Sequence, residues 1–253
     1  MTVAGLPVLL ALLGLGTWQA GRLREVEALK ERIAVNVDRP PLGNAELARG
    51  VAAGDLDWRQ VSLRGSWVWD GWLVVDRQYR LSVPGYHLFM PLQLADPPGS
   101  RVLVDRGWVP KEGFEERLEQ ERRANAPAVV TGLARYPDRR EGPVEPAEAP
   151  GPDGVARRWH DQGIASMNAH LGRPAEVWFV RAGTRVADDR PKGPAGSWPE
   201  GVWTTTYQSR PHLQYAITWY GLALALFGTW LAVSLRDLGQ EERPRGPRDR
   251  LDP

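Results

Sequence analysis

The chain has no cysteine, only three methionines and only four histidines. Without thiols it has no disulfide, thiolate nucleophile, cysteine-ligated zinc site or iron–sulfur cluster. A Cu(I) carrier needs soft sulfur ligands, and three methionines dispersed over 253 residues do not form a cluster, so copper delivery is excluded as well. The histidines that remain are His87, His160, His170 and His212.

Catalytic motifs are also missing. The sequence contains no GxSxG elbow, HExxH pair, P-loop, or GxGxxG turn after a strand, and no paired carboxylates in a recognisable motif. We therefore expect a protein that is not an enzyme, with structural roles for His87, His160 and His170. One enzymatic alternative stays open: a membrane-anchored hydrolase that uses His87 with Asp76 or Asp105.

Charge of one sign is not concentrated anywhere in the central part of the chain. The net charge is +1 with both signs interspersed, and no basic stripe carries interleaved aromatic residues. Nucleic acid is therefore not an expected partner.

Charge is absent from two long stretches, residues 2–21 and 211–235. A helix through either stretch reaches across the roughly 30 Å hydrocarbon core of a bilayer. The first stretch has neither a basic region before it nor an A-x-A cleavage site, so we interpret it as a retained anchor rather than a signal peptide. The sequence thus predicts transmembrane helices at 1–21 and 211–235, followed by a charged tail at 236–253.

The residues between the spans, 22–210, predict one β-rich extramembrane domain. The mean hydropathy of the whole chain, −0.40, indicates that this middle part is polar. Short β-like runs bounded by Gly, Pro or Asp are expected at 61–69, 72–75, 86–94, 101–104, 129–133 and 176–180. The predicted fold class is an α+β membrane protein whose domain is an antiparallel sheet or small barrel with a few helices.

Three helical segments accompany the strands. Residues 22–37 continue the first span as an amphipathic helix, 115–123 form a charged helix, and another helix follows Asp161 to Gly172. The Pro- and Gly-rich segments 137–158 and 188–201 predict exposed, mobile loops.

Smaller patterns carry structural predictions. Gly221 and Ala225, at small-xxx-small spacing, predict close packing of the two spans. Arg64, Asp105 and Arg106, each beside Gly or Trp, are expected to fix turns and strand ends.

Five motifs in order carry a family resemblance over nearly the whole chain. They are Leu15-Gly16-Thr17-Trp18-Gln19 with Arg22; Arg64-Gly65 with Trp67; Pro84-Gly85-Tyr86-His87; Val104 to Pro110; and His212 to Ala223. The chain resembles the Surfeit-locus family of cytochrome c oxidase assembly factors. Two positions depart from the family pattern, because Arg210 and Pro211 precede His212 and Val26 replaces a basic residue.

The resemblance implies a role in maturing the haem-bearing subunit of cytochrome c oxidase. It implies haem a as the cofactor, His212 as a ligand of the haem iron, and the oxidase subunit and haem a synthase as partners. It also implies a multi-pass protein of the inner or plasma membrane with its central domain on the periplasmic or extracytoplasmic face. The alternative is a scaffold that stabilises an oxidase assembly intermediate without touching cofactor.

Residue chemistry supports a ligand role for His212. Ionisable residues at membrane depth are costly and often functional, and imidazole is an accepted haem ligand. On a helix the small Ala216 and Ala223 share a face with His212 and are expected to leave room for a macrocycle, which Tyr215 and Trp219 would border. We expect Trp18, Gln19 and Arg22 near His212, and Arg22 or Arg210 as partners of the haem propionates. The alternative is an interfacial histidine that merely bonds a carbonyl or water.

The charges around the spans disagree with the implied topology. Arg22, Arg24, Lys30 and Arg32 follow the first span and no Lys or Arg precedes it, so the positive-inside rule places the domain in the cytoplasm. The arginines after 235 favour a cytoplasmic tail instead, and long domains translocate largely regardless of charge. We follow the family topology and expect the true N-terminus to lie upstream.

Overall fold

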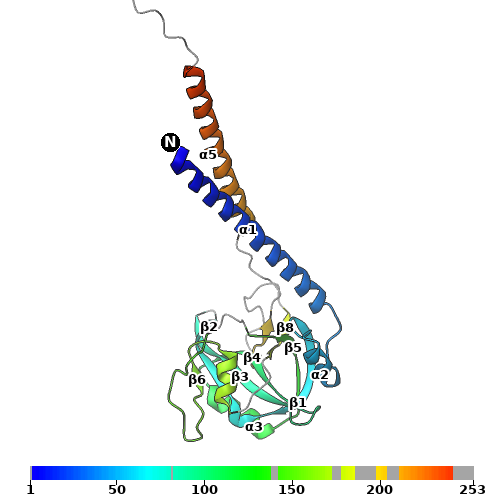
Figure 1. Ribbon diagram of the computed structural model, residues 1–253. Helices are drawn as coiled ribbons and strands as arrows, with labels where there is room; N and C mark the ends of the chain where they lie inside the picture. Colours follow the sequence, from blue (N-terminus) through cyan, green and yellow to red (C-terminus); the bar gives the residue numbers. More distant parts are fainter. Residues whose placement is uncertain are drawn as a thin grey trace, which may run out of the picture. The chain divides into compact units, whose positions relative to one another are not determined.

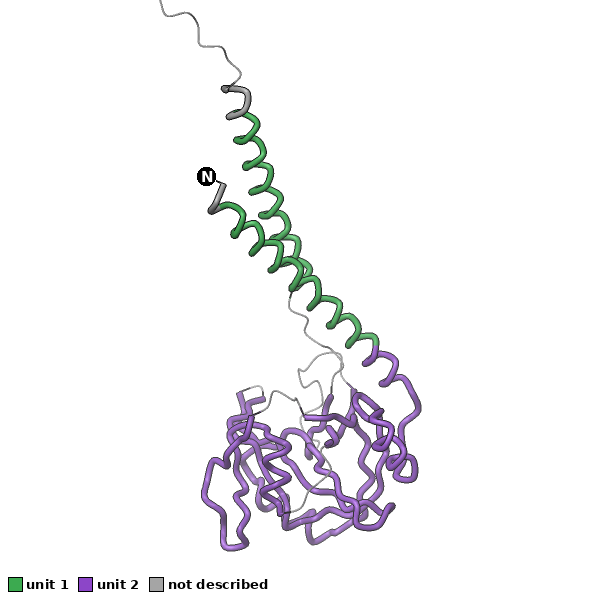
Figure 2. The backbone as a smooth tube through the Cα atoms, in the orientation of Figure 1, with its two compact units in different colours: residues 1–31, 207–253 green, residues 32–206 purple. Residues whose placement is uncertain are grey.

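The chain divides into two compact units, residues 1–31 with 207–253 and residues 32–206 (Figure 2). The computed structural model describes residues 2–80, 82–137, 142–172, 178–185, 198–203 and 211–241.

Two long helices, α1 (Thr2–Val37) and α5 (His212–Glu241), form the first unit, to which α1 contributes residues up to 31 (Figure 1). Their contacts pair Gln19 with His212 and Thr17 with Tyr220, so residue numbers rise in α5 as they fall in α1 and the helices are antiparallel. The better-buried positions of α5 recur at four- and three-residue steps, namely His212, Ala216, Trp219, Ala223 and Leu226. This period is that of a helix–helix seam.

Both helices are long and apolar enough to cross a membrane, over Gly5–Val37 and His212–Arg236. Only 6% and 11% of their most apolar windows are buried, so they are unlike the core helices of a soluble protein. Apolar side chains that remain exposed along a helix this long need a lipid environment. The two helices therefore support a membrane protein.

The second unit is built on a seven-stranded sheet with the order β1-β5-β7-β4-β3-β2-β6 and an additional pairing of β1 with β3. That pairing closes β1, β5, β7, β4 and β3 into a ring, while β2 and β6 extend the sheet from β3. The β4–β7 and β2–β6 pairs are parallel and the others antiparallel. The strands are β1 (Arg59–Trp67), β2 (Leu73–Arg80), β3 (Val83–Leu94), β4 (Arg101–Pro110), β5 (Ala128–Arg135), β6 (Arg158–Trp159) and β7 (Phe179–Ala182).

Short elements surround this barrel (Figure 1). They are α2 (Asn44–Ala52), the 3₁₀ turn η1 (Trp69–Gly71), α3 (Phe114–Ala124), α4 (Ile164–His170) and the parallel pair β8 (Thr184–Arg185) with β9 (Val202–Trp203). The helix α2, which the sequence did not predict, adds Leu47 to the cluster of Leu63, Val104 and Trp178. Met167 of α4 packs with Phe89 and Trp159, and Phe114 of α3 with Leu88. The predicted small barrel is thus confirmed, with a separate apolar cluster under each of these helices.

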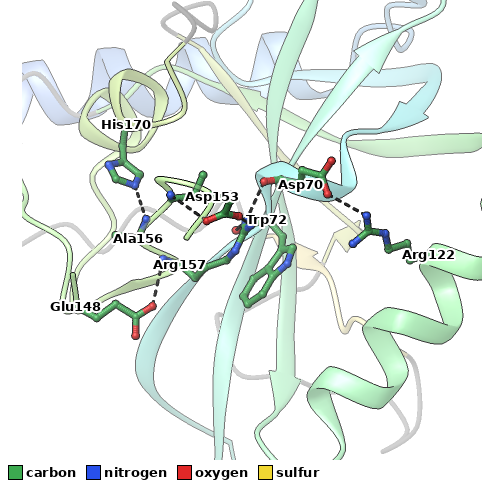
Figure 3. Close-up of polar contacts among 9 residues, drawn as sticks. Asp70, Trp72, Arg122, Glu148, Asp153, Ala156, Arg157 and His170 are labelled. Atoms are coloured by element: carbon green, nitrogen blue, oxygen red, sulfur yellow. Dashed lines mark hydrogen bonds and ion pairs between the residues drawn. The ribbon is translucent and has the colours of Figure 1, made fainter. Parts of the chain in front are cut away.

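The segment predicted as an exposed loop, 137–158, is mostly exposed where the structure describes it, but a few of its residues anchor it to the barrel unit. Ala156 is fully buried, and Val144 and Val155 pack against the cluster around Trp159. The Arg157 guanidinium donates to the carbonyls of Asp70 and Trp72 at 2.9 and 3.1 Å, lies 4.8 Å from the centroid of the Trp72 ring and pairs with Asp153 (Figure 3). The predicted exposure is therefore confirmed for most of this segment, whereas the anchoring contacts of Val144, Val155 and Arg157 are long-range and were not predicted from local composition. Most of the second predicted loop, 188–201, lies outside the described residues.

The strand predicted at 101–104 extends past Asp105 to Pro110, because a bulge accommodates Gly107 within the strand. Leu88 faces Gly107 and Phe89 faces Asp105, so Arg106 is the extra residue between them. Gly107 has φ +104°, and a Cβ there would lie 2.2 Å from the carbonyl oxygen of Glu200. Only glycine fits this position. Asp105 and Arg106 therefore shape the middle of a strand, not a strand end as predicted.

Candidate functional site

The start of α5 contacts α1 through a buried histidine. His212 is the first residue of α5 and is 8% exposed, and its Nδ1 atom lies 2.8 Å from Oε1 of Gln19. The predicted proximity of the end of the first span to His212 is thus confirmed for Gln19. Both residues stand at the same end of the helix pair, where the first uncharged run ends and the second begins.

This hydrogen bond fixes the tautomer of the imidazole. The Gln19 carbonyl oxygen only accepts, so Nδ1 of His212 carries the proton and donates it. In the tautomer that donates from Nδ1, Nε2 has the lone pair with which histidine binds a metal. The chemistry of the pair therefore fits an axial ligand of haem iron.

Small residues let the two helices approach next to this pair. Ala216 and Ala223 are 5% and 3% exposed, and a Cβ added at Gly16 would lie 2.8 Å from the Tyr220 ring. The Tyr220 hydroxyl lies 3.2 Å from Oγ1 of Thr17. The two alanines serve helix packing, so the expectation that they leave room for a macrocycle was wrong.

The predicted close contact through Gly221 and Ala225 was also wrong. Both residues are exposed, and nothing lies within 4 Å of a Cβ built at Gly221. The small-residue seam runs through Ala216 and Ala223 instead, and Ala223, two residues from each of Gly221 and Ala225, lies on the opposite face of the helix.

The other residues predicted around His212 occupy different settings. Trp219 is half-buried in the seam, whereas Tyr215 and Trp18 are 50% and 62% exposed. The Arg22 guanidinium forms an ion pair of 2.5 Å with Glu25 one turn further along α1. Arg210 lies outside the described residues.

A second histidine, His87 on β3, belongs to the barrel unit. Its Nδ1 lies 3.2 Å from Oδ1 of Asp105, which is 1% exposed and accepts a hydrogen bond of 3.0 Å from the Gly107 N–H. Nε of Arg181 lies 3.5 Å from the other oxygen of Asp105. The bulge in β4 thus positions a carboxylate behind the imidazole, an arrangement that the spacing of His87 and Asp105 left open.

The neighbouring charges shift the pKa values of both His87 and Asp105. Burial lowers the pKa of His87, but the charge of Asp105 and its hydrogen bond raise it further, and the net shift is upward. Burial raises the pKa of Asp105, and the His87 charge and hydrogen bond, Arg181 and the Gly107 N–H together bring it below the ordinary value. The pair is therefore an ion pair over a wider pH range than isolated side chains would allow.

His87 also lines a cavity of about 120 Å³ with Val75, Gln78, Phe89, His160, Asp161 and Gln162. None of these lining residues has a nucleophilic hydroxyl or thiol side chain. Among the described residues, no group of three or more His, Asp or Glu is arranged to hold a metal ion. The His87–Asp105 pair therefore has the orientation of a catalytic dyad, and the described residues that line the cavity place no hydroxyl or thiol nucleophile beside it.

Comparison with known proteins identifies the family to which the chain belongs. The model of the SURF1 family matches residues 6–224. The chain belongs to the SURF1 family. Surfeit locus protein 1 of Takifugu rubripes is 26% identical over 89% of this chain and 93% of its own length. The human Surfeit locus protein 1 is 28% identical over 88% of this chain and 74% of its own, and a SURF1-like protein of Drosophila melanogaster is 27% identical over 86% and 72%.

The SURF1 match includes the whole barrel unit, α1 from residue 6 onward and residues 212–224 of α5. The motifs that suggested the family have distinct structural uses. The first and last motifs contribute Gln19 and His212 to one hydrogen bond, and the motif of residues 104–110 forms the bulge behind His87. Sequence reasoning placed Gln19 near His212 but did not foresee the hydrogen bond, because a side-chain contact depends on the helix rotation that packing sets.

Proposed function

We propose that this SURF1-family protein is a cytochrome c oxidase assembly factor that carries haem a as cargo and assists its insertion into the haem-bearing subunit. The observation that carries the proposal is the buried His212 whose Nδ1 proton is held by Gln19, with Nε2 in the metal-binding form. An ordinary interfacial histidine would face water and carbonyls rather than a side-chain acceptor on another apolar helix.

The residues present fit the cargo in part. His212 supplies an imidazole, and Arg22 supplies a cation for a propionate, since its i,i+3 pair with Glu25 stabilises the helix by only about 0.5 kcal/mol and exchanges readily. The seam between α1 and α5 is filled by Ala216, Ala223 and the Tyr220 ring. The macrocycle is therefore expected to lie against the start of α5, beside the exposed Tyr215, and not along the alanine face.

The proposal includes a location and partners. We place the protein in the inner or plasma membrane with both helices spanning and the barrel unit on the extracytoplasmic face. The partners are then the haem-bearing oxidase subunit, as recipient, and haem a synthase, as donor. The chain itself supplies a ligand and helix surface and is not an enzyme.

The test is a haem spectrum of the protein purified in detergent from cells that make haem a. We expect a Soret band in the wild type that is lost in His212→Ala and kept in the matched control His170→Ala, whose ring accepts a 2.6 Å hydrogen bond from the Ala156 N–H in the barrel unit. A wild type that stabilises the oxidase subunit while containing no haem would favour the cofactor-free scaffold instead.

A further inference from the structure

We infer that Gln19 is the positioning residue for His212, acting on the haem iron only through the imidazole. This inference rests on the proposed function. Gln19 lies on α1, whereas the proposed ligand His212 lies on α5. The orientation of the ligand therefore depends on the packing of the two helices.

The geometry supports this role directly. The contact is 2.8 Å long, it joins two helices of the same unit, and the residues are 193 positions apart in the sequence. Gln19 is partly buried and His212 is 8% exposed, so water competes poorly for the imidazole proton. A hydrogen bond in such low-dielectric surroundings is stronger than one at a wet surface, and leaving its donor unpaired is costly.

Neighbouring polar groups are already engaged with other partners. The Thr17 hydroxyl donates to the Leu13 carbonyl at 2.8 Å and lies next to the Tyr220 hydroxyl, and the Thr218 hydroxyl donates to the Gln214 carbonyl at 2.9 Å. Among the contacts of the described residues, Gln19 is therefore the group that sets the orientation and tautomer of the His212 ring.

The chemical consequence is a change in the electron-donor strength of the His212 imidazole. An acceptor on Nδ1 makes Nε2 a better electron donor, as acceptors behind metal-bound histidines generally do. A better donor favours the ferric state over the ferrous one and strengthens the iron–histidine bond. Removal of such partners typically weakens metal binding about 10- to 100-fold. Because Gln19 comes from α1, separation of the two helices would remove this support and loosen the cargo.

Three variants test the inference on detergent-purified protein loaded with haem a. Gln19→Leu removes the acceptor, and we expect about tenfold weaker haem binding, a lower iron–histidine stretching frequency in the ferrous protein and a higher reduction potential. Gln19→Glu keeps an acceptor and strengthens it, so binding is retained and both spectroscopic shifts reverse. Gln214→Leu makes the same chemical change at an exposed position of α5 and should leave all three quantities unchanged.

The outcomes separate this inference from the proposed function. Haem bound through His212 with the same affinity, stretching frequency and potential in Gln19→Leu would overturn the role of Gln19 and leave the proposed function standing. Absence of haem in the wild type would overturn both. If Gln19→Leu does not fold, Gln19→Glu decides, because an unchanged frequency and potential in that variant contradict a hydrogen bond to the ligand.

Discussion

At the scale of single residues, His87 is partly exposed to solvent and contacts a buried carboxylate, that of Asp105. Its side chain is 38% exposed, whereas Asp105 behind it is 1% exposed. The net effect raises the pKa of His87 above its ordinary value near 6.5 and lowers that of Asp105. A raised histidine pKa contributes stability that is complete below about pH 6.5 and is lost as the pH rises through the folded-state pKa.

We therefore predict that His87→Gln lowers the stability of the protein more at pH 5.5 than at pH 8.5. Thermal unfolding of the wild type and the variant over this range measures the difference. Asp105→Asn removes the same attraction from the other side and should flatten the same pH dependence. A difference between wild type and His87→Gln that is constant with pH would contradict the ion pair.

The residue scale is also where sequence reasoning was least complete. It identified His212 because a histidine at the edge of an uncharged run is unusual, and it identified Gln19 as a neighbour because the two spans flank one domain. It left open whether His87 pairs with Asp76 or Asp105, since the contact with Asp105 depends on the register of β3 against β4 and on the bulge at Arg106. Register and bulges are set by the whole sheet rather than by local composition.

At the scale of elements, the pair of α1 and α5 packs through small residues. Gly16 faces the Tyr220 ring with no space for a side chain, whereas nothing lies within 4 Å of a Cβ at Gly14. We predict that Gly16→Leu destabilises the helix pair by about 1–3 kcal/mol, because overpacking forces the helices apart. Gly14→Leu, two residues away in the same apolar helix, is the matched control and should be close to neutral.

Thermal unfolding in detergent measures this difference. Equal effects of the two leucines would show that the helices do not pack on the Gly16 face. The result also bears on His212, since a helix pair that is forced apart at Gly16 should lose the Gln19 hydrogen bond.

A second element, the segment that ends at β6, depends on one arginine. Arg157 donates hydrogen bonds to the carbonyls of Asp70 and Trp72 and stacks on the Trp72 ring (Figure 3). The Arg158 side chain, in contrast, is 48% exposed and lies 3.8 Å from Glu148. We predict that Arg157→Ala costs about 2 kcal/mol, about 1 for each hydrogen bond, and speeds cleavage between residues 142 and 157 by a protease of broad specificity. Arg158→Ala should cost less than about 0.5 kcal/mol. Cleavage at the wild-type rate in Arg157→Ala would contradict the anchoring role.

At the scale of the whole molecule, the two terminal helices and the β-rich middle follow from the sequence. Long uncharged runs and short β-like runs are local signals, and the structure confirms both. The closure of β1 onto β3 has no local signal, because residues 65–67 and 92–94 meet only after the chain between them has folded. The helix α2 was not predicted for a related reason. Its nine residues are too few to show a clear helical period of apolar residues, and the helix is stabilised by the packing of Leu47 in the barrel core.

The side of the membrane on which the barrel unit lies is a property that the fold alone does not determine. Charges after the first span favour the cytoplasm, and charges after the second span favour the opposite arrangement. The absence of cysteine makes this question accessible, because a single introduced cysteine is then the only thiol in the chain. Two exposed positions suit the experiment, Glu119 on α3 in the barrel unit and Arg236 near the end of α5.

We predict that a membrane-impermeant maleimide applied to intact cells labels Glu119→Cys and not Arg236→Cys. The reason is that the barrel unit of 175 residues, 32–206, is a long domain whose translocation is largely independent of flanking arginines, while the basic tail is retained inside. Permeabilised cells, in which both variants should react, provide the control for accessibility. Labelling of Arg236→Cys alone in intact cells would contradict this orientation. His212 and Gln19 would then lie at the cytoplasmic end of their spans, away from the extracytoplasmic side on which we propose that the haem is transferred.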